Sequence, residues 1–110
     1  MTDVLGDLGR FAEPSLLILV SLSDRPKHGY AIMDDLEAIG DIRVGPGTLY
    51  AALARLEARG LIEALPPDAR RRPYRLTGLG VTTLKARLEQ LQDVAETGLR
   101  RLEDGGAQGS

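Results

Sequence analysis

Residues 45–60 constrain the fold more than any other segment, because their apolar side chains recur with a helical period. Leu49, Leu53 and Leu56 are spaced by four and three residues, so they form one stripe that must pack against other elements. The side chains away from that stripe are small or lightly charged: Thr48, Tyr50, Ala51 and Arg55. A helix that faces only water usually carries more Glu and Lys, so this face suits a helix that lies in a groove. On the pattern alone, an ordinary amphipathic core helix is the alternative.

Charge is distributed unevenly along the 110 residues, whose formal net charge is −2. Residues 1–41 hold three basic and eight acidic side chains, a balance of −5. Residues 42–76 hold seven arginines against three acidic side chains, a balance of +4, and residues 77–110 have a balance of −1. Salt screens a charge over roughly 8 Å, so the local balance decides whether a surface attracts DNA. The middle third is therefore the basic face, and arginine suits forked contacts with phosphate and guanine.

The composition excludes several classes of function. Cysteine is absent, so the chain has no disulfide framework, thiolate metal site or cysteine nucleophile. The best apolar run, residues 16–22, is far shorter than the roughly 18 residues that span a bilayer. No secretion leader is recognisable, so we expect a cytoplasmic protein without a membrane partner. His28 is the single histidine and has no nucleophile or second ligand beside it, so we expect neither an enzyme nor a metal or cofactor site.

Two helices are expected before the 45–60 segment. Pro14 should open a strongly apolar helix at the centre of the core, with a buried strand as the minority alternative. Apolar residues at helical spacing predict a second helix over residues 29–39, closed by Gly40 in the manner of a C-cap. The tight connection over residues 41–47 then gives a helix-turn-helix layout. A further short helix is expected over residues 3–11.

A hairpin is predicted after the 45–60 helix, with strands over residues 61–65 and 70–76 and a turn over residues 66–69. Pro73 cannot donate to a strand ladder, which predicts an edge position for the second strand. The tip would carry three consecutive arginines: Arg70, Arg71 and Arg72. A hairpin in this place makes a wing, and its arginines should contact phosphate. Charges that merely keep a loop solvated are the alternative.

The last predicted helix runs from about Thr77, a reasonable N-cap, to Leu102. Its small and apolar residues step by four and three: Leu84, Leu88, Leu91, Ala95, Gly98 and Leu102. This spacing follows the 3.5-residue repeat of a helix that packs along another helix. We expect the seam to pair two copies of the chain, with packing inside one copy as the alternative.

Three motifs stand in order along the chain: KHGYAI at residues 27–32, GTLYAALARLEARGLI at residues 47–62, and RPYRLT at residues 72–77 with Gly80. Together they resemble the PadR family of bacterial transcriptional regulators. The resemblance implies a winged helix-turn-helix that dimerises through a C-terminal helix and binds operator DNA, usually as a repressor. The short final helix is similar to that of the family's compact subgroup. Ala51 departs from the family by replacing a proline that is often found there.

We therefore expect a winged helix-turn-helix over residues 1–76, mainly α-helical with a small β-hairpin, then a dimerisation helix over residues 77–104 and a disordered tail over residues 105–110. The expected function is sequence-specific DNA binding by a homodimeric repressor on a palindromic operator. The residues expected to contact DNA are Lys27, Arg43, Gly47, Thr48, Tyr50, Arg55, Arg70, Arg71 and Arg72. The residues expected at the dimer seam are Leu84, Leu88, Leu91, Ala95 and Leu102.

Two other functions remain open at the level of sequence. A winged helix can act as a protein interaction module without specific DNA binding. The resemblance also extends to family members that bind aromatic ligands between subunits, which would add a small-molecule effector. The chain has only four aromatic residues with which to stack such a ligand: Phe11, Tyr30, Tyr50 and Tyr74. The sequence names no effector.

Overall fold

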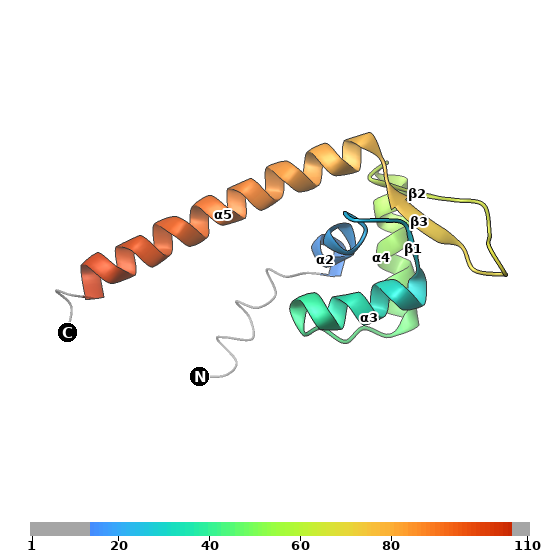
Figure 1. Ribbon diagram of the computed structural model, residues 1–110, viewed down its shortest axis with the longest axis horizontal. Coiled ribbons are helices and arrows are strands. Elements are labelled where there is room, and N and C mark those ends of the chain that lie inside the picture. Colours follow the sequence, from blue (N-terminus) through green and yellow to red (C-terminus); the bar gives the residue numbers. More distant parts are fainter. Residues whose placement is uncertain (1–13, 107–110) are drawn as a thin grey trace.

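The computed structural model describes residues 14–106, which form four helices and a small antiparallel sheet (Figure 1). The helices are α2 (Pro14–Ser21), α3 (Gly29–Gly40), α4 (Pro46–Ala58) and α5 (Gly78–Gly106). The strands are β1 (Lys27–His28), β2 (Ile62–Ala64) and β3 (Pro73–Leu76). This arrangement is the mainly α-helical winged helix-turn-helix that the sequence predicts. The helix expected over residues 3–11 lies outside the described residues.

Helix α2 supplies the centre of the hydrophobic core. Pro14 occupies its first turn, where a missing N–H costs nothing, and Ile18 is completely buried. The predicted stripe of α4 packs into the same core, since Leu49, Leu53 and Leu56 are all buried. The helical prediction for both segments is confirmed, and the strand alternative for α2 is excluded.

Helix α3 ends one residue later than predicted. Asp41, not Gly40, is the C-cap in the left-handed conformation (φ 54°), and its backbone N–H donates to the Glu37 carbonyl. Gly40 has a different role, because a Cβ there would lie 2.5 Å from a methyl carbon of Leu17. The missing side chain therefore lets the end of α3 approach α2.

The sheet has the strand order β1-β3-β2, with both pairs antiparallel. The sequence predicts only the β2–β3 hairpin and favours a turn over residues 23–27, so β1 (Lys27–His28) is an addition. It makes β3 the central strand, which corrects the edge position predicted from Pro73. Proline is tolerated because it is the first residue of β3. There it lies opposite His28, and its carbonyl accepts a hydrogen bond of 2.8 Å from the Leu65 backbone N–H.

The wing consists of residues 62–76. The chain reverses at its tip, two residues later than predicted. The backbone N–H groups of Asp68 and Arg71 each donate to the other's carbonyl, at 2.7 and 2.8 Å. Between them, Ala69 (φ 49°) and Arg70 (φ 68°) both have positive φ, which defines a type I′ turn. Arg70 therefore lies in the turn and not in the returning strand, which begins at Pro73.

Helix α5 leaves the domain on the side away from the wing (Figure 1). Its N-cap is Thr77, as predicted, because the Thr77 hydroxyl accepts a hydrogen bond of 3.0 Å from the Gly80 backbone N–H. The helix continues to Gly106, past the predicted end at Leu102 and into the segment expected to be a tail. At about 1.5 Å per residue, its 29 residues extend roughly 44 Å.

Candidate nucleic-acid interface

The exposed side of α4 has a narrow crest of small residues. Successive residues on a helix are rotated by roughly 100°, so the side opposite the buried leucines is formed by four exposed positions. These positions, called the crest below, are Gly47, Ala51, Ala54 and Ala58. Thr48 and Arg55 flank the crest on one side, and Tyr50 flanks it on the other. The three predicted groove residues are thus all exposed, but they border the crest and do not form one patch.

The ring of Tyr50 lies against the beginning of α3. A Cβ atom on Gly29 would overlap the Tyr50 hydroxyl oxygen and would lie 2.9 Å from Cζ of the same ring. Glycine at position 29 therefore leaves the space that the phenol occupies. Tyr50 remains 45 % exposed, so its hydroxyl is accessible where α3 and α4 meet.

The wing carries arginines without carboxylate partners. Arg70, Arg71 and Arg72 are exposed at its tip, and none forms an ion pair with another described residue. Arg71 instead donates from Nη1 to Nε2 of His28, at 3.2 Å. Two other arginines of the basic segment are paired: Arg75 with Glu63 at 2.5 Å, and Arg43 with Glu37 at 3.0 Å. The three arginines at the wing tip therefore carry positive charge that no ion pair with a described residue offsets.

A hollow of about 280 Å³ lies between the start of α3, Tyr50 of α4 and the wing tip. Its lining residues are His28, Gly29, Tyr30, Tyr50, Arg70, Arg71 and Arg72. Four of the predicted DNA contacts thus meet in one place. The sequence did not predict that His28 and Tyr30 line this hollow, because their proximity to the wing depends on the pairing of β1 with β3.

Lys27 is not part of this surface, which corrects its prediction as a phosphate contact. The side chain is buried, and Nζ donates to the Ser21 carbonyl and, at 2.5 Å, to Oδ1 of Asp24. Oδ2 of Asp35 lies 3.3 Å from the same nitrogen. The hydrogen bond from Lys27 lowers the pKa of the Asp24 carboxyl. Lys27 is thus an internal cation that joins α2, β1 and α3.

The apolar seam of α5 divides into two parts. Leu84 is only 4 % exposed and belongs to the core of its own domain, which corrects its prediction as a dimer contact. Farther along, Leu88 is 41 % and Leu102 is 72 % exposed, Ala95 is exposed, and Leu91 is half-buried. Val94 and Leu99, which the seam did not include, are exposed as well. The described residues leave this second part of the seam uncovered.

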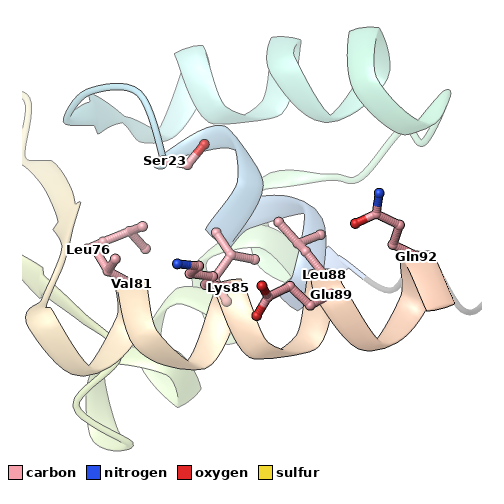
Figure 2. Close-up of a pocket in the computed structure, with 8 residues that line it drawn as sticks. Ser23, Leu76, Val81, Lys85, Leu88, Glu89 and Gln92 are labelled. Carbon is pink, nitrogen blue, oxygen red and sulfur yellow. The ribbon is translucent and has the colours of Figure 1, made fainter.

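A groove of about 280 Å³ accompanies the seam where α5 passes the end of α2. Figure 2 shows Val81, Leu88 and Gln92 along α5, with Leu76 of β3 at one end. Its lining is mostly apolar, and Lys85 and Glu89 lie at its border. The groove thus extends the uncovered apolar side of α5 toward the body of the domain.

Two kinds of site are not found in residues 14–106. No group of three or more histidine, aspartate or glutamate side chains is placed to hold a metal ion there. None of the helices in this range is both long and apolar enough to cross a membrane.

Comparison with known proteins places this geometry in context. The family described as "Transcriptional regulator PadR-like family" matches residues 18–86, from α2 into α5. Transcriptional regulator Rv3488 of Mycobacterium tuberculosis is 41% identical over 83 residues, which cover 73% of this chain and 77% of that protein. An uncharacterized 37.1 kDa protein in transposon Tn4556 of Streptomyces fradiae is 46% identical over 71 residues, or 64% of this chain. The chain spans only 21% of the length of that protein.

Solved structures show the same fold. A PadR family transcription regulator from Clostridium difficile superposes with a TM-score of 0.72 at 23% identity, covering 81% of this chain and 97% of that one. A PadR family transcriptional regulator from Eggerthella lenta has a TM-score of 0.71 at 26% identity, covering 93% and 91% of the two chains.

Proposed function

The chain belongs to the PadR-like family of transcriptional regulators, and from this premise we propose that it represses transcription by binding a palindromic operator as a homodimer. One observation supports the proposal most directly. Tyr50, which flanks the exposed crest of α4, lines one hollow together with three wing arginines that have no carboxylate partner among the described residues. A narrow helix beside an uncompensated positive wing suits a major groove about 12 Å wide and its flanking phosphates.

In this proposal, α4 enters the major groove and the wing contacts the backbone. Gly47 and Thr48 approach base edges from the first turn of α4, and Arg55 does so from its last turn. Tyr50 contacts the backbone side of the same groove. Phosphates are neutralised by Arg70, Arg71 and Arg72. Arg43 contributes less to phosphate binding, because Glu37 already pairs with it. Occupation of a promoter by such a complex would block transcription.

The proposed dimer forms through α5. Two helices that pair along the uncovered seam would hide Leu102, the most exposed leucine of residues 14–106, which a monomer leaves in water. Pairing would present two copies of α4 to one face of the duplex. In helix-turn-helix dimers such copies lie roughly 34–36 Å apart, one turn of DNA, so the operator should be a palindrome with that spacing.

The proposal is tested by selecting bound sequences from random duplexes with the purified 110-residue chain, and by measuring its mass in solution. A palindromic consensus together with a dimeric mass is the expected result. A dimer that enriches no sequence would overturn the DNA-binding proposal and favour a protein interaction module. A monomer that binds a single half-site would overturn the proposed assembly.

A further inference from the structure

His28 connects the start of the helix-turn-helix with the tip of the wing. It is the last residue of β1 and the N-cap of α3, and it lies opposite Pro73 in the sheet. Its Nε2 atom is 3.2 Å from Nη1 of Arg71, a residue 43 positions away in the chain. The imidazole therefore contacts an arginine at the wall of the hollow.

The chemistry of this contact determines the protonation state of the ring. A guanidinium has five N–H donors and no acceptor, so Nε2 of His28 must accept the hydrogen bond. In the neutral ring the proton is then on Nδ1, which is buried and has no hydrogen-bond partner among the described residues. A second proton on the ring would remove the acceptor at Nε2 and place two positive charges side by side. The contact thus requires neutral His28.

We propose that His28 is a positioning residue for DNA binding: its Nε2 holds the Arg71 guanidinium at the hollow, where it meets a phosphate of the DNA backbone. This inference rests on the proposed function, because DNA supplies the phosphate. His28 itself adds no charge and need not touch the DNA. Holding Arg71 in advance reduces the side-chain entropy that is lost when the phosphate arrives.

Three further features of the hollow suit a phosphate. Its lining includes no carboxylate, and it combines the three wing arginines with the Tyr50 hydroxyl. The first N–H groups of α3 begin at Gly29, and no side chain caps them. Such N–H groups attract anions when other cationic groups are present. Asp68 lies on the other side of His28, in a separate cavity that also contains Ala69, Arg71 and Pro73.

The test compares His28→Ala with Arg71→Ala in the full chain, on the duplex obtained by selection. Dissociation constants are measured at several salt concentrations. Each lost phosphate contact flattens the slope of log K against log salt by about 0.9. We expect both variants to lose roughly tenfold in affinity and to flatten the slope equally, although only one of them removes a charge. In the double variant, His28→Ala should add nothing to Arg71→Ala.

Two controls separate positioning from a general loss of structure. Arg72→Ala removes the same charge from the same hollow without a contact to His28, so its effect and that of His28→Ala should add. His28→Gln keeps a neutral acceptor, so it should recover affinity relative to His28→Ala. Loss of affinity with an unchanged salt slope, or a full additional loss in the Arg71→Ala background, would overturn the proposal.

Failure of this inference is distinguishable from failure of the proposed function, because each variant is compared with the wild-type chain on the same duplex. A wild-type chain that binds no duplex would instead remove the proposed function itself.

Discussion

The phenol of Tyr50 lies over Gly29, so the residue that begins α3 determines where the tyrosine of α4 is placed. The two positions meet where the start of α3 packs against α4, beside the wing. A side chain at position 29 would turn the ring toward the space that DNA is proposed to occupy.

Gly29→Ala should therefore destabilise the fold through Tyr50. Overpacking of this kind costs about 1–3 kcal/mol, and we expect that loss in urea unfolding. In a Tyr50→Ala background the same substitution should be neutral or stabilising, because alanine is a better helix former than glycine. Gly45→Ser, at a glycine with open space around it, is the matched control. Equal losses in both backgrounds would disprove the coupling.

Ala51→Glu tests the crest of α4. The position is exposed, so the free energy of unfolding should change by less than about 0.5 kcal/mol. DNA affinity should fall by more than about tenfold, because a carboxylate would face the phosphates and widen the helix. Ala86→Glu introduces the same change at an exposed position of α5 and should leave binding intact. Fluorescence anisotropy with a labelled duplex measures the DNA affinity of both variants.

Leu84 and Leu102 belong to one sequence repeat but have different surroundings. Leu84→Ala should cost about 2–5 kcal/mol of stability, because it opens a cavity in the core. Leu102→Asp should leave the fold intact and shift the solution mass from dimer to monomer, which light scattering can detect. If Leu102→Asp remains dimeric at micromolar concentration, the seam proposed for assembly is wrong.

The leucine positions also show what can be predicted from sequence. Periodicity identifies a stripe that must be covered, and it correctly predicts α3, α4 and the helix-turn-helix that they form. It does not tell which partner covers each part of the stripe. Leu84 and Leu102 therefore look equivalent until the domain is folded.

Other features were missed because their cause is tertiary. A strand of two residues, β1, is too short to show alternation, and its pairing with β3 is what moves Pro73 to the centre of the sheet. Lys27 looks like a surface cation because its partners, the Ser21 carbonyl and the Asp35 carboxylate, come together around it only when α2 and α3 pack. His28 becomes part of the candidate site only through the same strand pairing.

The buried Lys27 should matter for stability and not for DNA binding. Lys27→Met keeps the apolar stem but leaves the Ser21 carbonyl without this donor and Asp35 without its cation, so we expect a loss of roughly 1–3 kcal/mol at neutral pH. The salt slope of DNA binding should not change. A flatter slope in Lys27→Met would show that Lys27 contacts a DNA phosphate.

The pair formed by Lys27 and Asp24 also predicts an acid dependence. The folded-state pKa of Asp24 is lowered from its ordinary value of 3.8, chiefly by the hydrogen bond from Lys27. As the pH falls, the Asp24 carboxyl therefore takes up a proton in the unfolded chain before it does so in the folded chain. The stabilisation of the fold by this pair is complete above the ordinary pKa. It is lost as the pH falls through the lower folded pKa. Urea unfolding between about pH 5 and pH 2 should show this loss in the wild type and a smaller one in Lys27→Met.

The wing tip can be stabilised at Ala69. Both central residues of its type I′ turn have positive φ, yet neither is the glycine or asparagine that such turns favour, which is why the sequence placed the turn elsewhere. Asparagine tolerates the left-handed region better than alanine, so Ala69→Asn should stabilise the turn by about 0.5–1 kcal/mol without altering the charge of the wing. The Arg71 amide, which donates to the Asp68 carbonyl, should exchange its hydrogen more slowly. Ala64→Asn, in β2, is the control and should bring no such protection.

A more ordered tip should also strengthen DNA binding slightly, because Arg70 and Arg71 would lose less freedom on contact. Unchanged exchange at Arg71 would show that the turn is not strained in solution.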